Sequence, residues 1–515
     1  MTSPDHVPSR RIGRSARSLR HSTDFSVRQR ETPYLDALAA YRDVGYTSFA
    51  TPGHKRGKGA PAKLVDVLGP AVLSVDAARA GGVDDTRESS GFMAAAECLA
   101  AEAYGADRAW FLVNGSTSGV HALVLGLASP GDCLVVPRNS HKSMLAAFIL
   151  SGVVPHYVEP VIHGEWQIPL GVTPEDLASA VAQRPEARAV FVASPNMYGV
   201  CADLTGLAEV AHTHGLPCVV DQAWGPHLRF CSRLPVDAMQ ADADASVTSI
   251  HKLCSGLTQS SVLLARGPRV DLERLAQVAL MTQSTSPQAL IYASIDAARQ
   301  QLVTQGEELW GRALERAEWA RRQIDELPGL AVFGEAQCDS DQAFEIDRTR
   351  LTIGARGLGL SGYELETLLR CDYRVIVEMS DPLNVVCNIT HADTSDDLRT
   401  LVGALAAISQ RYCGDCSPSR VLRCAEALTP PRFAGQVLSP REAFFSASRA
   451  IPTKDAAGET AAEMVTPYPP GVPVLGPGEA ISDEIVAYLL AGAEMGLHVH
   501  GPRDASLRTI RVVDQ

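Results

Sequence analysis

One lysine in this sequence stands where an amine could act as a nucleophile. Lys252 closes the apolar, alternating stretch ASVTSIHK, and small and hydroxyl residues follow it. A lysine amine placed at the end of a strand can form a Schiff base with a carbonyl group. The position of this residue therefore raises the question of which groups would surround such an amine.

A carboxylate and a phosphate-binding turn precede the lysine in the chain. Asp221 ends the run CVVD, and a carboxylate there could stabilise a protonated heterocyclic nitrogen or simply cap the next helix. Gly115, Ser116 and Thr117 lie in LVNGSTSG, where a strand passes into a helix whose free N–H groups favour an anion. Hydroxyl residues at a helix start can also be ordinary N-caps. Together with the lysine, these are the parts needed to hold pyridoxal phosphate, which is the predicted cofactor.

The elements that must position these residues follow an α/β pattern. From about residue 96 onward, helical patterns alternate with short apolar runs, which implies βαβ units and a mainly parallel sheet. In an open α/β sheet, ligands bind at the carboxyl ends of the strands. Each polar residue at such an end could be structural, but together they could surround one crevice: Asn114, Asn139, Ser194, Asp221 and Lys252.

The length of 515 residues indicates two or three domains. A long helical pattern from about 287 to 327 is expected to connect a large domain to a second domain of strands and helices. A linker near 411 to 420 leads to a third segment. The predicted organisation is a disordered basic arm (1–30), an N-terminal segment with a cofactor-binding large domain (31–290), the connector helix with a small domain (291–415), and a C-terminal domain (416–515).

Composition argues against several classes of partner. The net charge of −13 makes a general affinity for nucleic acid or anionic membranes unexpected, and no apolar run is long enough to span a membrane. Twelve cysteines without a secretory signal predict reduced thiols in a soluble, cytoplasmic protein. The Arg- and Ser-rich opening segment is predicted to be a solvated arm, with an organellar presequence as the alternative.

No metal site is expected from the cysteines or histidines. Cys413 and Cys416 form one CxxC without a second pair at zinc-finger spacing. Two pairs of histidines lack a neighbouring carboxylate or cysteine and are predicted to be surface or interface residues: His212 with His214, and His498 with His500.

Several further motifs, in their order and spacing, carry a resemblance to a known family. They are FATPGHKRGKGA (49–60), VNGSTSG (113–119), VPRNSHKSM (136–144), SPNMYGVCADL (194–204), VDQAWGPH (220–227), SIHKL (249–253) and TPYPPGVPVLGPGE (466–479). From about residue 31 to the C-terminus, the chain resembles the short form of the bacterial ornithine/lysine/arginine decarboxylases. The resemblance implies a fold-type-I, aspartate aminotransferase-like large domain with a small α+β domain and a C-terminal α+β domain.

The resemblance also implies roles for individual residues. Lys252 resembles the lysine that carries the cofactor, Asp221 the partner of the pyridine nitrogen, and His141 the histidine that stacks on the ring. His251 lies beside the lysine and is a second candidate proton donor. The expected cofactor contacts also include Gly115, Ser116, Thr117, Ala223 and Ser249, together with Ser284, which in the family pattern reaches the phosphate from a neighbouring subunit. A homodimer or a higher even-numbered oligomer with shared active sites is therefore expected.

The reaction implied by the resemblance is decarboxylation of a basic L-amino acid to an amine and CO2, toward polyamine or diamine synthesis. L-Arginine is the first choice, because a planar guanidinium pairs bidentately with one carboxylate, and lysine and ornithine follow. Glu479 is the expected carboxylate for the substrate's cationic end, or alternatively a turn residue that caps the next helix. Asp85 and Glu378 are weaker candidates.

Other reactions share the same cofactor residues. The alternatives are an aminotransferase, an aldolase or a decarboxylating oxidase, and, least expected, a catalytically dead pseudoenzyme. Gln222 stands where short-form relatives often have Glu, and the segment 81–92 differs from the family pattern, which leaves substrate identity open. Trp224 and His227 are expected either to touch the cofactor or to pack the turn after Asp221.

Overall fold

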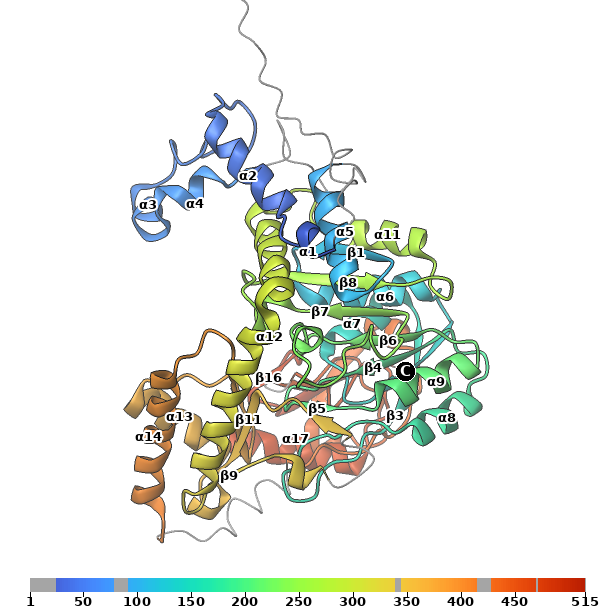
Figure 1. Cartoon of the computed structure of the whole chain (residues 1–515). Coiled ribbons are helices and arrows are strands. Elements are labelled where there is room, and N and C mark those ends of the chain that lie inside the picture. Colours follow the sequence, from blue (N-terminus) through green and yellow to red (C-terminus); the bar gives the residue numbers. More distant parts are fainter. Residues whose placement is uncertain (1–24, 78–90, 339–343, 415–427, 469–470, 515) are drawn as a thin grey trace, which may run out of the picture.

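The fold was analysed in a computed structural model of the chain (Figure 1). The structure describes residues 25–77, 91–338, 344–414, 428–468 and 471–514. Asp85, Cys416 and the first 24 residues of the predicted arm lie outside the described residues.

A seven-stranded sheet forms the centre of the large domain, in the order β1-β8-β7-β6-β4-β2-β3. Neighbouring strands among β2, β3, β4, β6 and β7 pair in parallel, whereas β8 pairs antiparallel with both β7 and β1. The prediction of an α/β fold with a mainly parallel sheet is confirmed. The strands are β1 (Arg108–Leu112), β2 (Cys133–Pro137), β3 (Val154–Val158), β4 (Ala189–Ala193), β6 (Cys218–Asp221), β7 (Ala245–Thr248) and β8 (Ser261–Ala265).

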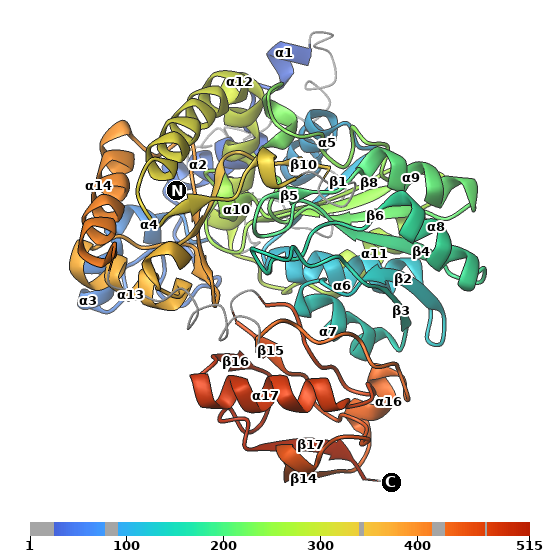
Figure 2. The same ribbon diagram turned by 90° about the horizontal axis from the view of Figure 1, so that it is seen from below.

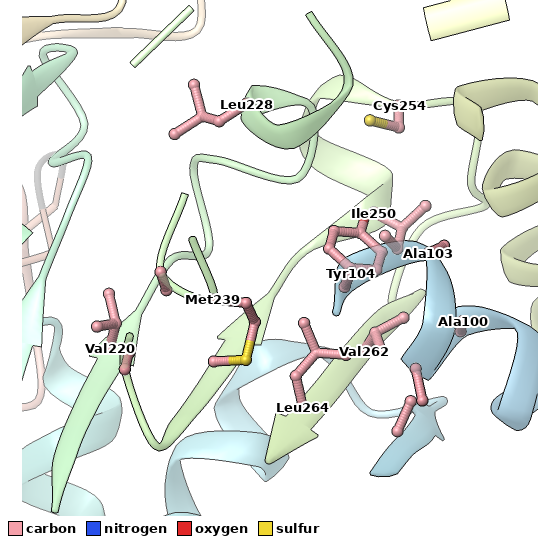
Figure 3. Packing of buried hydrophobic residues seen from close by; sticks show 14 of the residues in the cluster. Ala100, Ala103, Tyr104, Val220, Leu228, Met239, Ile250, Cys254, Val262 and Leu264 are labelled. Atoms are coloured by element: carbon pink, nitrogen blue, oxygen red, sulfur yellow. The ribbon is translucent and has the colours of Figure 1, made fainter. Parts of the chain in front are cut away.

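Helices cover both faces of this sheet because its strands are apolar on both sides. In β6, for example, Val219 packs with the helices of one face and Val220 with those of the other. Figure 3 shows Val262 and Leu264 of β8 beside Tyr104, and Val220 belongs to the same apolar cluster. One face carries α6 (Gly115–Leu127), α7 (Lys142–Ser151) and α11 (Leu272–Met281), and the other α5 (Phe92–Tyr104), α8 (Pro174–Gln183), α9 (Leu204–Thr213) and the long α12 (Ala289–Asp325).

The small domain follows α12 and contains a second, four-stranded sheet in the order β12-β13-β11-β9. Its strands pair antiparallel and pack under two helices. A two-stranded ladder of β5 (Val200–Cys201) and β10 (Glu345–Ile346) joins it to the large domain. The other elements are β9 (Ala331–Val332), β11 (Arg350–Gly354), α13 (Gly362–Tyr373), β12 (Met379–Ser380), β13 (Asn384–Asn388) and α14 (Ser395–Tyr412).

The C-terminal domain lies against α7 of the large domain (Figure 2). Arg441 donates hydrogen bonds to the carbonyl oxygens of Ile149 and Leu150 at the end of that helix. A separate apolar cluster holds the domain together around α17. Its elements are α16 (Pro440–Phe445), β14 (Ser448–Pro452), β15 (Thr466–Pro467), α17 (Asp483–Met495), β16 (Val499–His500) and β17 (Thr509–Val513).

The N-terminal segment is partly packed and partly exposed. The prediction of a disordered arm is wrong for residues 25–30, because α1 (Phe25–Arg28) is helical and Gln29 is fully buried, where its amide donates to the carbonyl oxygen of Leu99. The next helix, α2 (Pro33–Val44), packs on α12, whereas α3 (Ala62–Leu68) and α4 (Pro70–Ser74) lie apart from the large domain in Figure 1. Within the described residues, no helix is both long and apolar enough to cross a membrane.

Candidate active site

Lys252 lies in a short helical turn, α10 (Ile250–Leu253), directly after β7. Ile250 and Leu253 are 1% and 2% exposed, and they anchor this turn in the core. Figure 3 shows Ile250 and Cys254 among the packed residues of that core. Burial lowers the pKa of Lys252 to about 8, although the negative charge of Asp221 opposes the shift. An amine with this pKa is neutral in roughly a tenth of the molecules at pH 7, far more than an ordinary lysine, and the neutral form is the one that acts as a nucleophile.

Asp221 occupies the end of β6, next to the strand that leads to the lysine. Its Oδ1 accepts a hydrogen bond of 3.1 Å from the backbone N–H of Ala223. Burial raises the pKa of Asp221, and the charge of Lys252 and this hydrogen bond only partly offset the effect. Lys252 alone does not fully stabilise the charged form of this carboxylate. A second cation nearby, such as a protonated ring nitrogen, would stabilise it further.

A cluster of hydroxyl groups meets the N-terminus of α6. The Oγ atoms of Ser116 and Ser249 are 2.7 Å apart, and Ser261 Oγ lies 3.3 Å from that of Ser116. Gly115, with φ of +69°, begins the helix, and Thr117 is exposed in its first turn. These hydroxyls and the free N–H groups of the first turn form a cup of donors for a phosphate group.

A glycine brings α6 close enough to the sheet for this cup to form. A Cβ atom on Gly119 would lie only 2.4 Å from Val247 Cγ2 and 2.9 Å from Leu112 Cδ1. Any larger residue would push the helix away from β7. The second glycine of GSTSG therefore positions Ser116 against Ser249.

Two histidines flank the lysine, and both are neutral at physiological pH. His141 caps α7 by accepting a hydrogen bond from the N–H of Ser143, and burial with the charges of Lys252 and Lys142 lowers its pKa to about 3. The Nδ1 of His251 lies 2.9 Å from the carbonyl oxygen of Ser260, so it carries the proton in that contact. Burial also lowers the pKa of His251. The Nε2 of His251 is then an acceptor beside the lysine.

An indole and an arginine complete the surroundings of the lysine. The Nζ of Lys252 lies 3.7 Å from the ring centroid of Trp224, and the guanidinium carbon of Arg350 lies 4.5 Å from it. Arg350 begins β11 in the small domain, is fully buried, and donates a hydrogen bond of 3.0 Å to the carbonyl oxygen of Trp224. Its positive charge contributes to the lowered pKa of Lys252. No sequence motif indicated Arg350, because it joins the site from another domain.

Glu378 faces the same group of charges from the small domain. Its Oε2 accepts a hydrogen bond of 2.9 Å from Asn388, whose own oxygen accepts one from Arg350. Burial raises the pKa of Glu378, while the charges of Arg350 and Lys252 act in the opposite direction. Its side chain is only partly buried, so this carboxylate can receive a cation from solvent.

Glu479 has a different environment. It is 1% exposed, and its Oε2 lies 2.9 Å from Arg138, whose guanidinium also lies over the rings of Tyr157 and Phe433. The other carboxylate oxygen is buried without a hydrogen-bond partner among the described residues. In this chain Glu479 therefore joins the C-terminal domain to the large domain, and its predicted contact with substrate stays a prediction.

The remaining predicted residues fall into separate places. Asn139 and Ser194 hold loop backbone, because Asn139 donates to the carbonyl of Leu170 and Ser194 accepts from the N–H of Ala202. Asn114 is exposed at the start of α6. Ser284 is exposed and, within the described part of the chain, makes no contact with the cup. The ranges that the structure describes contain no group of three or more potential metal ligands.

The donor set fits pyridoxal phosphate. The cup of hydroxyl and backbone donors suits its phosphate, the buried carboxylate of Asp221 suits its protonated ring nitrogen, and the amine of Lys252 suits its aldehyde. His141 lies close enough to Lys252 for the charge of the lysine to lower its pKa, so it stays neutral and can contact the ring without adding a positive charge.

Comparison with known proteins gives the same assignment. The family model for the Orn/Lys/Arg decarboxylase major domain matches residues 32–351, and that for the C-terminal domain of the same family matches residues 426–502. An arginine decarboxylase of Bacillus subtilis is 36% identical over 95% of this chain and 99% of its own, and one of Halalkalibacterium halodurans is equally similar over the same shares. The solved structure of the lysine decarboxylase LdcF of Francisella novicida superposes with a TM-score of 0.82 at 20% identity, covering 94% of this chain and 81% of that one.

Proposed function

The chain belongs to the Orn/Lys/Arg decarboxylase family and is a pyridoxal phosphate-dependent decarboxylase of basic amino acids, and from this premise we propose that L-arginine is its substrate. The observation that supports arginine is the 36% identity with arginine decarboxylases over almost the whole of both chains. Lysine and ornithine decarboxylases of Escherichia coli are 23% and 24% identical. Lysine and ornithine are therefore the second candidates.

The chain's own residues have distinct tasks in this reaction. When bound, pyridoxal phosphate supplies an electron sink that accepts the electron pair left as CO2 departs. Asp221 keeps the ring nitrogen protonated so that this sink stays effective. Lys252 holds the cofactor and then returns a proton to the α-carbon, or His251 does so after its Nε2 has taken up a proton. Trp224 covers Lys252 and, with Arg350, keeps water from the amine.

We propose Glu378 rather than Glu479 as the first carboxylate to meet the substrate's guanidinium. Glu378 is accessible and lies within the electrostatic reach of Lys252. Glu479 is buried and already neutralised by Arg138, and separating that pair would leave an arginine without its counter-charge. Substitution of Glu378 and substitution of Glu479 are therefore expected to have opposite effects on the KM for arginine and on thermal stability.

The test measures CO2 and amine release from the cofactor-loaded protein with L-arginine, L-lysine and L-ornithine in turn. We expect arginine to give the highest kcat/KM. Glu378→Gln should raise KM for arginine by about tenfold or more, because a charge-assisted hydrogen bond contributes roughly 1.5–3 kcal/mol. Glu479→Gln should lower thermal stability and leave KM nearly unchanged. The reverse pattern would restore Glu479 as the substrate residue, and an α-keto acid in place of CO2 would overturn the decarboxylase assignment.

We also propose that the enzyme is a dimer in which a second copy covers the projecting segment, defined as residues 46–77. Phe49 and Val67 are 93% and 74% exposed there, and Leu64, Leu68 and Val72 are also exposed. Apolar residues gathered on a projecting segment lose free energy when they face water, and a second copy would bury them. Ser284 of that copy would then be the further phosphate ligand. The ten described cysteines are all free, which fits the proposed cytoplasmic location.

Sedimentation velocity tests this assembly. The unmodified protein is expected to sediment as a dimer or a larger even-numbered oligomer at micromolar concentration. Val67→Glu together with Leu68→Glu should shift it toward monomers, because two charges would enter the apolar contact. Val437→Glu, at a valine that is 55% exposed in the C-terminal domain, is the matched control and should leave the assembly intact. A fully active monomer would contradict the proposal.

A further inference from the structure

A buried histidine and aspartate join the turn after Asp221 to the small domain. His227 Nε2 lies 3.3 Å from Asp347 Oδ2, and both side chains are 0% exposed. The two groups are not aligned as a hydrogen bond, and they form an ion pair when the imidazole of His227 is protonated. Burial alone would raise the pKa of Asp347, but His227 and Arg350 outweigh it and hold this pKa well below its usual range.

The two residues belong to turns that meet at two points. One turn contains Trp224 and His227, and the other runs from Asp347 to Arg350. Arg350 donates to the carbonyl oxygen of Trp224 at 3.0 Å, and the His227–Asp347 contact joins the same two turns at a second point. The position of Arg350 relative to Trp224 is thus set by both contacts.

Asp347 also shapes the turn from which Arg350 emerges. Its Oδ1 accepts hydrogen bonds from the N–H of Thr349 at 3.0 Å and from its hydroxyl at 2.6 Å, and its carbonyl accepts from the N–H of Arg350 at 3.0 Å. Gly199, with φ of +90°, lies directly underneath, where a Cβ atom would come within 2.8 Å of Arg350 Cγ. The backbone around Arg350 is therefore closely fitted.

The ring of His227 is held by aromatic packing. Trp310 of α12 lies against it, with the ring centroids 4.1 Å apart and the planes at 37°. His391 also contacts Trp310, with 5.6 Å between their ring centroids. The charge of His227 also acts on the pKa of His391. The pair is thus fixed on each side by residues of different elements.

We propose that His227 and Asp347 are positioning residues that hold Arg350 against Trp224 and so set the charge environment of Lys252. A buried ion pair gains little net stability over an apolar replacement of similar shape, so stability does not by itself account for this pair. Its geometry instead fixes a cation beside the catalytic amine. Lys252 is also faced by the charges of Asp221 and Glu378, and its own charge acts on His141 and His251. The inference rests on the proposed cofactor chemistry at Lys252.

The test is a pH titration of the cofactor-loaded protein, followed by the absorbance of the bound cofactor. Arg350 disfavours a proton on the Lys252 nitrogen, so displacing Arg350 makes protonation easier. His227→Asn and Asp347→Asn should each raise the midpoint of this titration by at least about half a pH unit, within the range of effects of nearby charges. The double variant should shift it no further than either single variant, because both changes remove the same contact.

A second histidine–aspartate pair provides the matched control. His212 Nε2 lies 2.8 Å from Asp244 Oδ2, at the opposite end of strands β6 and β7. His212 was predicted to be a surface or interface residue, and the structure instead pairs its largely buried ring with this carboxylate. We expect His212→Asn to lower the melting temperature as much as His227→Asn does, without moving the absorbance titration.

Each outcome of the test has a clear meaning. If the His227 and Asp347 variants lose stability and bind cofactor with an unchanged midpoint, the pair is structural and the proposal fails. If His227→Asn does not fold, the double variant, which has no unpaired buried charge, carries the test. If the unmodified protein forms no cofactor absorbance band at all, the failure belongs to the proposed function instead.

Discussion

Replacing Lys252 with methionine should abolish CO2 release from every basic amino acid. The amine is both the attachment point of the cofactor and one of the two candidate proton donors, and methionine keeps the length of the side chain without the nitrogen. A positioned proton donor alone contributes about 10²–10⁴-fold, so we expect kcat to fall by at least about a thousandfold. Arginine at this position is the control for charge, and it should be equally inactive because a guanidinium does not lose its proton.

The lowered pKa of Lys252 should be visible in the pH dependence of cofactor attachment. Because the pKa of Lys252 is about 8, the rate of cofactor attachment to cofactor-free protein should rise with pH and level off above about pH 8. An ordinary exposed lysine would keep gaining reactivity up to its usual pKa near 10.4. Borohydride reduction followed by peptide mapping should label Lys252. A label on another lysine would refute the assignment of the nucleophile.

The sequence predicted the positions of those active-site residues that lie at the end of a strand or at the start of a helix. Asp221 ends β6, Lys252 lies in the helical turn that follows β7 rather than in the strand itself, and Ser116 lies in the first turn of the helix that follows β1. Parallel strands bring such ends to one edge of a sheet, so the alternating pattern was sufficient to group them. The antiparallel pairing of β8 was not predicted, because an apolar run of five residues carries no mark of its direction.

Residues that join the site across domains carry no such local signal. Arg350 lies 98 positions after Lys252, and it reaches Trp224 from the small domain, which the ladder of β5 and β10 joins to the large domain. Glu479 shows the opposite problem. Its motif suggested a substrate contact, but the structure surrounds its carboxylate with Arg138 and the C-terminal domain. Sequence identifies that a carboxylate is present, and tertiary packing decides which cation it meets.

The second large effect concerns Asp221. Asparagine has nearly the same shape, but it carries no charge to balance a protonated ring nitrogen. Asp221→Asn should therefore lower kcat by about 10²–10³-fold, the scale measured when one preorganised electrostatic partner is removed from an active site. It should also weaken cofactor binding, which equilibrium dialysis measures independently of activity.

Asp244, at the other end of β6 and β7, provides the control. It distinguishes an effect of charge in the active site from an effect of losing a buried group in the core. Asp244 is 3% exposed and accepts a hydrogen bond of 2.8 Å from the N–H of Cys218, at the beginning of β6. Asp244→Asn removes an even less exposed carboxylate from the same sheet, so it should lower stability and leave cofactor affinity unchanged. Asp221→Glu should retain more activity than Asp221→Asn, because it keeps the charge although the carboxylate is displaced. Equal losses in the Asp221→Asn and Asp244→Asn variants would mean that Asp221 supports the sheet rather than the cofactor.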